Sequence, residues 1–201
     1  WLTAQAIEVA GIELRALRVN YVGELGWELH VPMNQLEPLY GAIWSAGESL
    51  GIADFGVYAV NSLRMEKAYR AYGSELTTEI TMIDAGMERF VKFEKEHFTG
   101  KEALLKRKAE GSGYQLIYAQ LASSDSDIRG GEPVFDGASV IGVTTSWAYG
   151  HTVGKQLIFA YVKPVNGTPP PTFDIDILGK RYQAEVLSEP IFYPKIERPR
   201  S

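Results

Sequence analysis

Apolar and polar residues alternate on both sides of a short glycine-containing insert near the start of the chain. The stretch is residues 18–30, RVNYVGELGWELH, in which residues 23–26 form the insert. This arrangement predicts a β-hairpin with a four-residue loop. In that register Tyr21 lies directly opposite Glu28, with the two Cβ atoms about 5 Å apart on one face. The pattern therefore predicts a phenol beside a carboxylate.

The carboxylate of Glu28 suggests a binding role. A carboxylate only accepts hydrogen bonds, and its two oxygens can take a parallel pair from a planar donor. The edge of a heterocycle such as a pterin offers a donor pair of this kind. The alternative is an edge hairpin on which Glu28 and the turn residue Glu24 are simply solvated.

Helical spacing follows the hairpin. Apolar residues recur every three or four positions over 34–50 and again over about 55–67. Asn34 and Glu37 predict a capping box at the start of the first helix, and Gly51 is placed to end it.

The second predicted helix carries three charged residues, Arg64, Glu66 and Lys67. We expect these side chains to face outward or toward a cleft. The alternative is that they only form charge pairs within the helix.

After a third predicted helix, apolar residues recur at every second position instead of every third or fourth. That helix opens at a capping box of Thr99 and Glu102 and closes near Gly111. Beyond it, alternating runs separated by turn residues predict strands at 115–121, 139–148, 156–162, 173–178 and 181–187. Short strands at this spacing indicate a small antiparallel barrel or sandwich. The predicted fold class is α+β, with domains at residues 1–112 and 113–201.

Composition excludes several classes of protein. The 201 residues are 45% hydrophobic and 22% charged, which is typical of a globular protein, and the net charge of −5 argues against nucleic-acid binding. There is no cysteine, so neither a disulfide nor a cysteine-based metal site is expected. His30, His97 and His151 lack metal-ligand spacing, and no apolar run is long enough to cross a membrane. We therefore expect no metal, nucleic-acid or membrane partner.

The residues alone predict no reaction. None of the 20 glycines falls in a dinucleotide-binding or Walker pattern. A triad of Ser146, His151 and Asp176 could be assembled on paper, but no nucleophile-elbow motif supports it. We assign no catalytic residue.

Four separated stretches can be compared with known families: RVNYVGELGWE (18–28), SLRMEKAYRAYG (62–73), residues 84–91 followed by FTGKEAL (98–104), and IGVTTS (141–146). Taken in order, they resemble the folate-dependent aminomethyltransferase family, that is, the glycine-cleavage T-protein and its relatives. The sequences GELGWE (23–28) and LRMEKAY (63–69) look most like the C-terminal module of dimethylglycine and sarcosine dehydrogenases. The resemblance runs from about residue 12 to 194.

This resemblance implies a fold and a set of contacts. The fold would be the C-terminal part of an aminomethyltransferase folate-binding domain, followed by a small antiparallel β-barrel. Tyr21 and Glu28 would contact tetrahydrofolate, with the carboxylate holding the pterin edge. Arg64 and Tyr69 fall in the stretch that lines the folate cleft in relatives.

Two departures from the family pattern change the expectation. Residues 60–61 are Val-Asn where glycine-cleavage T-proteins carry an Arg-Asp pair, which favours the dehydrogenase branch. The family also has a long segment before the hairpin, including an aspartate implicated in one-carbon transfer. We therefore expect this chain to be a fragment that is inactive alone, with FAD confined to a separate upstream domain of its parent.

The resulting expectation is a tetrahydrofolate-binding, one-carbon-transfer module of a dimethylglycine or sarcosine dehydrogenase-like enzyme. The alternatives are a stand-alone aminomethyltransferase or folate-dependent demethylase, and a non-catalytic folate-binding regulatory module. Besides folate, the expected partners are a second copy of the chain or the flavin-containing part of the parent. The expected location is the cytoplasm, or the mitochondrial matrix in a eukaryote.

Overall fold

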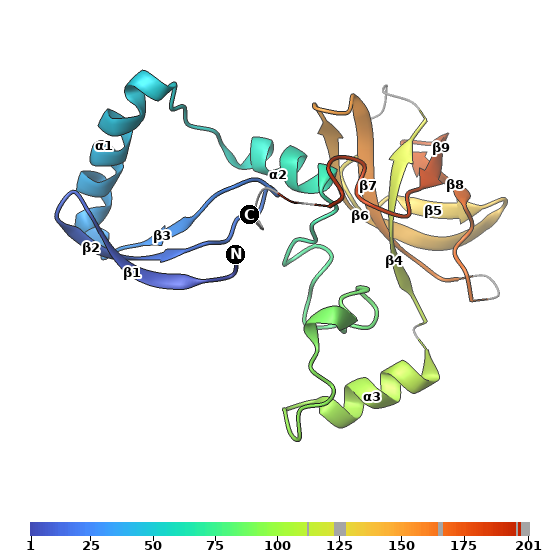
Figure 1. Cartoon of the computed structure of the whole chain (residues 1–201). Coiled ribbons are helices and arrows are strands. Elements are labelled where there is room, and N and C mark those ends of the chain that lie inside the picture. The colour runs from blue at the N-terminus through green and yellow to red at the C-terminus, as the bar shows by residue number, and fades with distance from the viewer. Residues whose placement is uncertain (112, 123–127, 165–166, 196, 198–201) are drawn as a thin grey trace. The chain divides into compact units, whose positions relative to one another are not determined.

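The computed structural model describes residues 1–111, 113–122, 128–164, 167–195 and 197. The chain forms two compact units (Figure 1). The first comprises Trp1–Arg64 with the described residues from Tyr193 onward, and the second comprises Met65–Phe192. The sequence-based division at residues 112 and 113 stays a prediction.

The first unit is built on a three-stranded antiparallel sheet. Its strands are β1 (Ala4–Val9), β2 (Ile12–Leu17) and β3 (Glu28–His30), in the order β1-β2-β3. The turn between β1 and β2 places Ala10 at φ 52° and Gly11 at φ 77°. Two consecutive positive φ angles suit the twist of a tight hairpin. The sequence pattern missed β1.

One helix covers one face of this sheet. A 3-10 turn (Met33–Gln35) leads into α1 (Leu36–Gly47), and a second 3-10 turn (Glu48–Leu50) ends at Gly51 with φ 77°. The predicted end at Gly51 is confirmed. The predicted start is wrong, because Asn34 lies within the 3-10 turn and Gln35 occupies the N-cap position.

The core of the first unit is small. Leu39 of α1 packs against Leu14 and Ala16 of β2, and partly buried apolar residues surround these three. The chain then enters α2 (Val57–Glu66), close to its predicted position.

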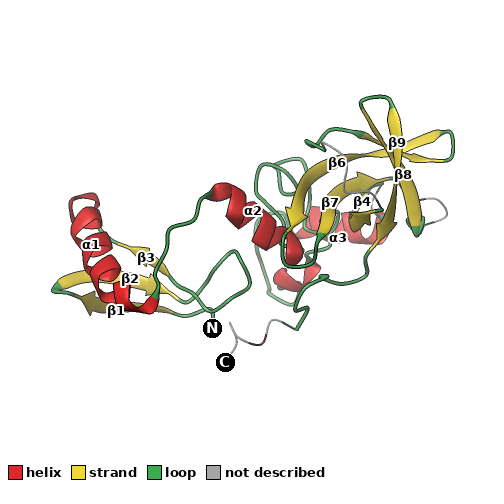
Figure 2. Cartoon of the chain, turned by 90° about the horizontal axis from the view of Figure 1, so that it is seen from above, coloured by secondary structure: helices red, strands yellow, loops and turns green. Residues whose placement is uncertain are grey.

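The second unit is dominated by a closed six-stranded barrel with strand order β4-β7-β6-β5-β8-β9 (Figure 2). All its strand pairs are antiparallel. The strands are β4 (Gln115–Leu121), β5 (Pro133–Asp136), β6 (Ser139–Gly150), β7 (Lys155–Val162), β8 (Thr172–Ile177) and β9 (Lys180–Val186). The α+β class with an antiparallel barrel is confirmed. The sequence pattern missed only β5 among these strands.

Strand β7 is covered on both faces. Ile158, Ala160 and Val162 belong to one apolar cluster. Leu157, Phe159 and Tyr161 alternate with them and belong to a second cluster, which includes Met65 and Ala68. Burial of both faces explains why this strand is almost continuously apolar.

The segment between α2 and the barrel carries little regular structure. It contains a 3-10 turn (Glu88–Phe90) and α3 (Lys101–Glu110). The N-cap of α3 is Gly100, at φ 87°, so the predicted cap at Thr99 is wrong. None of the helices among the described residues has the length and apolar character needed to cross a membrane.

Candidate functional site

A ten-residue loop, residues 18–27, separates β2 from β3. The strand register pairs Glu28 with Leu17, and His30 with Arg15. The predicted hairpin, with Tyr21 opposite Glu28, is therefore wrong in register. Tyr21 lies within the loop, and Glu28 is the first residue of β3.

The side chain of Asn20 explains why the backbone pairing of β2 with β3 does not continue into the loop. Its side-chain Oδ1 accepts hydrogen bonds from the backbone N–H groups of Val22 (3.0 Å), Gly23 (2.6 Å) and Glu24 (3.3 Å). Its Nδ2 donates to the backbone carbonyl of Glu24. These local bonds compete directly with strand pairing, as Asn side chains commonly do. The polypeptide around Tyr21 is thus closed into a turn.

The base of the loop is held by the chain next to it. Arg18 donates its backbone N–H to the carbonyl of Thr3 at 2.8 Å and accepts from Leu2 at 3.1 Å. The Arg18 guanidinium carbon lies 5.8 Å from the centroid of the Trp27 ring, within cation–π range. The two ends of the loop are therefore linked.

Glu28 points away from α1. Neighbouring Leu29 packs in the apolar cluster with α1, and side chains alternate along a strand, so Glu28 and His30 project from the other face. Their side chains are 55% and 59% exposed, and Glu28 Oε2 lies 3.4 Å from His30 Nε2. The Glu28 carboxylate is thus accessible and can accept hydrogen bonds from a ligand.

A pocket of about 550 Å³ opens on the opposite face of the same sheet. Its lining residues come from the segment before β1, the three strands, the loop and α1: Thr3, Gln5, Ile7, Val9, Ala16, Arg18, Trp27, Leu29 and Ile43. Because Leu29 lines this pocket and Glu28 faces the other way, the pocket and the Glu28 carboxylate are separate features. The sequence pattern gave no signal for this pocket.

Arg64 and Tyr69 lie at and after the end of α2. Arg64 is only 3% exposed, and its Nε donates to Asn61 Oδ1 at 2.9 Å. Tyr69 is partly buried in the second unit. Tyr21, Glu28 and Arg64 belong to the first unit. Their participation in one site stays a prediction.

The outward orientation expected as one alternative for Arg64, Glu66 and Lys67 is wrong, because all three are buried. Their orientation toward a cleft stays a prediction. Glu66 Oε1 accepts the backbone N–H of Thr152 at 2.7 Å. Lys67 Nζ lies 4.0 Å above the ring of Phe192. These contacts offset part of the cost of removing the charges from water.

Glu75 anchors the segment that follows Tyr69. This fully buried carboxylate accepts the backbone N–H of Ala71 at 2.8 Å through Oε2. Its Oε1 accepts the hydroxyls of Thr145 and Ser146, and its backbone carbonyl accepts the Tyr161 hydroxyl at 2.8 Å. Burial, with the nearby carboxylates of Glu75 and Asp84, raises the pKa of Tyr161 above its usual range. The phenol therefore stays a donor.

A β-bulge makes the Glu75 contact possible. The register of β6 against β7 shifts between Thr144 and Ser146, leaving Thr145 as the extra residue. A bulge places side chains that would otherwise alternate near the same side of a strand. Two successive hydroxyls can therefore reach one carboxylate oxygen. The sequence pattern gave no signal for this role of Glu75.

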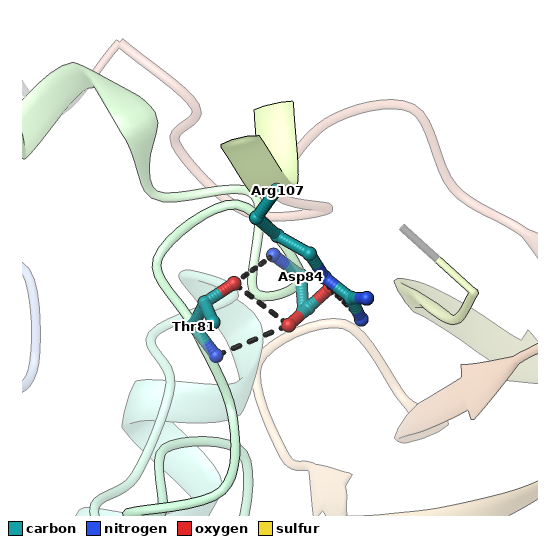
Figure 3. Close-up of polar contacts among 3 residues, drawn as sticks. All are labelled: Thr81, Asp84 and Arg107. Carbon is teal, nitrogen blue, oxygen red and sulfur yellow. Dashed lines mark hydrogen bonds and ion pairs between the residues drawn. The ribbon is translucent and has the colours of Figure 1, made fainter. Parts of the chain in front are cut away.

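A second buried carboxylate, Asp84, joins the loop after Glu75 to α3 (Figure 3). Its Oδ1 accepts from Arg107 Nε at 3.1 Å and Nη2 at 2.9 Å. Its Oδ2 accepts the hydroxyl of Thr81 at 2.7 Å and the backbone N–H of Thr81 at 3.2 Å. Its backbone carbonyl accepts the N–H of Leu116, at the start of the barrel, at 3.2 Å. These contacts give Asp84 a structural role.

Two family models match the chain. The GCVT N-terminal domain matches residues 1–95, and the glycine cleavage T-protein C-terminal barrel domain matches residues 115–193. The second match coincides with the barrel.

Individual proteins agree with these models. Dimethylglycine dehydrogenase, mitochondrial, from Rattus norvegicus is 39% identical over 201 residues, which is all of this chain and 24% of that protein. An aminomethyltransferase from Streptomyces avermitilis is 36% identical over 188 residues, which is 92% of this chain and 50% of that protein. The chain therefore spans about a quarter and about half of these relatives' lengths.

A solved structure gives the same result for the fold. The crystal structure of glycine cleavage system aminomethyltransferase T from Bartonella henselae superposes with a TM-score of 0.79 at 27% identity, covering 90% of this chain and 50% of that one. With both family models and these relatives in agreement, the chain belongs to the glycine cleavage T-protein family of aminomethyltransferase-like proteins.

Proposed function

We propose that this chain binds tetrahydrofolate and forms the one-carbon-transfer module of an enzyme like dimethylglycine or sarcosine dehydrogenase. The observation that carries the proposal is the 39% identity to rat dimethylglycine dehydrogenase along the whole chain. Because the match covers 24% of that relative, we propose that this chain works as part of a larger polypeptide. The flavin chemistry would belong to another part of it.

Glu28 is the proposed anchor for the pterin edge. Its carboxylate is more than half exposed at the start of β3, so both oxygens can accept a parallel pair of N–H groups. Tyr21, in the loop that leads to β3, is the proposed second contact. Arg64 and Tyr69 are proposed as further folate contacts on the family resemblance alone.

Tetrahydrofolate supplies the amine that captures the one-carbon unit when it is bound. In the parent, we propose that the flavin part removes two electrons from an N-methyl amine and leaves an iminium carbon or its formaldehyde equivalent. The task of this chain is to hold the folate amine close to that carbon, which raises its effective concentration. The products would be methylenetetrahydrofolate and the demethylated amine, or water in addition where the carbon arrives as formaldehyde.

A stand-alone aminomethyltransferase is the second candidate. The match to half of the Streptomyces avermitilis aminomethyltransferase favours it. The full-length protein would then transfer the carbon without a bound flavin. Absorbance of the purified full-length protein between 350 and about 500 nm, where flavins absorb, separates the two candidates.

The test of folate binding is the substitution Glu28→Gln in the full-length protein. The amide replaces one acceptor with a donor, so one folate N–H loses its partner and faces another donor. We expect tetrahydrofolate binding to weaken by about 100-fold in calorimetric titration, which corresponds to about 3 kcal/mol.

Glu13→Gln provides the matched control. Glu13 is an exposed residue of β2 that pairs with Glu8, away from Glu28, and it undergoes the same change of charge. Its dissociation constant should stay within about twofold of the original. Equal affinity of the original protein and Glu28→Gln would remove Glu28 from the proposed role.

The relatives also bear on location. The rat relative is a mitochondrial protein, which supports a mitochondrial location if this chain comes from a eukaryote. Association with the flavin part of its own polypeptide, or with a second copy, is proposed on the same basis.

A further inference from the structure

We infer that Asn20 is a positioning residue for folate binding, because it fixes the turn that presents Tyr21. This inference rests on the proposed function. Tyr21 is the only residue between Asn20 and Val22, and the bond from Val22 N–H to Asn20 Oδ1 closes a ring around it. The Tyr21 side chain is 38% exposed, so the turn holds its backbone while leaving part of the ring accessible.

The side chain of Asn20 forms the hydrogen bonds that hold the backbone of the turn. Asn20 Oδ1 gathers three successive backbone donors, from Val22, Gly23 and Glu24, and its Nδ2 returns to the Glu24 carbonyl. Gly23 adopts φ 70°, which glycine reaches without steric cost. The turn is therefore set by local hydrogen bonds rather than by strand pairing.

The returning limb of the loop packs against the same residue. A Cβ added at Gly26 would lie 3.3 Å from Asn20 Cβ, so this limb passes close to the Asn20 side chain. Asn20 thus contacts both limbs of the loop, which carries Tyr21 and ends at Glu28. A loop without this contact samples more conformations, and ordering it on binding costs conformational entropy.

Three variants of the full-length protein test the inference. Asn20→Ala removes the acceptor, Asn20→Asp keeps it, and Leu25→Ala changes an exposed apolar residue of the same loop that takes no part in these bonds. We expect Asn20→Ala to weaken tetrahydrofolate binding about tenfold, Asn20→Asp to restore it to within about threefold, and Leu25→Ala to stay within about twofold.

A second pair of measurements separates positioning from general stability. The thermal midpoint of Asn20→Ala should stay within about 2 °C of the original, because the loop lies outside the core. The amides of Val22, Gly23 and Glu24 should lose protection from hydrogen exchange. In turnover with tetrahydrofolate, KM should rise while kcat holds.

The outcomes are distinct. Unchanged tetrahydrofolate affinity in Asn20→Ala, with the original protein binding normally, overturns the inference and leaves the proposed function standing. An Asn20→Asp variant as weak as Asn20→Ala overturns the claim that the acceptor oxygen alone suffices, because Asp keeps that oxygen and loses the Nδ2–H bond to the Glu24 carbonyl. No binding by the original protein overturns the proposed function and the inference with it.

Discussion

At the scale of single residues, buried carboxylates act as structural anchors in this chain. Glu75 and Asp84 each bind several donors from segments distant in sequence, and neither was recognised from the pattern of the chain. A buried carboxylate that keeps all its donors organises the structure around it, whereas one that loses them is costly.

Asp84→Asn should lower the free energy of unfolding by about 2 kcal/mol. The amide keeps one acceptor oxygen, so it can serve either Arg107 or Thr81 but no longer both. Denaturant unfolding of both proteins gives the difference. The matched control is Asp176→Asn, since Asp176 pairs with Arg181 at 3.3 Å near the surface and should cost less than about 1 kcal/mol. Equal losses would contradict an anchoring role for Asp84.

At the scale of elements, a close approach between two strands fixes a glycine in the barrel. A Cβ at Gly142 of β6 would lie 2.0 Å from the carbonyl oxygen of Tyr161 and 2.8 Å from the Cα of Val162. These are backbone atoms of β7, so they can yield only if the two strands separate.

Gly142→Ala should therefore destabilise the barrel by about 3 kcal/mol or more. Gly41→Ala is the opposite case, because Gly41 lies inside α1 and its added Cβ meets nothing within 4 Å. That substitution should stabilise the protein by about 0.5–1 kcal/mol. Thermal unfolding followed by circular dichroism measures both changes, the loss of stability in Gly142→Ala and the gain in Gly41→Ala. Equal tolerance of the two alanines would contradict the strand contact.

Elements with strong periodicity could be predicted from the sequence. The alternating runs of β6, β8 and β9, the largely apolar runs of β4 and β7, and the apolar spacing of α1 gave their positions within a few residues. β5 was missed because it has four residues and starts with Pro133, which weakens a strand signal. The two predicted N-caps, Asn34 and Thr99, were wrong because several residue types suit the turn before a helix equally well.

The predicted geometry of the candidate site was wrong, and the folate-binding role of its residues stays a prediction. The alternation around Gly23 and Gly26 continues through residues 18–22, so the pattern extended β2 to Val22. The Asn20 side chain overrides that pattern with local bonds to the backbone. An Asn followed three residues later by a Gly is a turn signal, and giving it more weight would have found the loop.

At the scale of the whole molecule, the two units differ in how much apolar surface they bury. Among the described residues, the core cluster of the first unit contains three buried residues, Leu14, Ala16 and Leu39, whereas the second unit has two extended clusters around the barrel. A segment that buries more apolar surface is more stable against local unfolding.

Amide hydrogens of β1–β3 should exchange faster than those of β4 and β7 under native conditions. The expected gap is at least about tenfold in protection factor, because sparse packing permits opening of the sheet without global unfolding. Hydrogen exchange followed by mass spectrometry resolves these segments. Tyr118 and Phe159, whose rings lie 5.3 Å apart in the barrel, mark peptides that should be among the slowest. Uniform exchange across both units would contradict this order.

The pairing of Arg18 with Trp27 gives the loop an optical reporter of its own. The indole is 54% exposed and lies at the end of the loop that Asn20 organises, with a guanidinium 5.8 Å from its ring. Indole fluorescence responds to nearby charge and to water. If Trp1, Trp44 and Trp147 are replaced by phenylalanine in the 201-residue chain, the remaining indole emission comes from Trp27. Loop ordering then becomes visible in real time, without an attached dye.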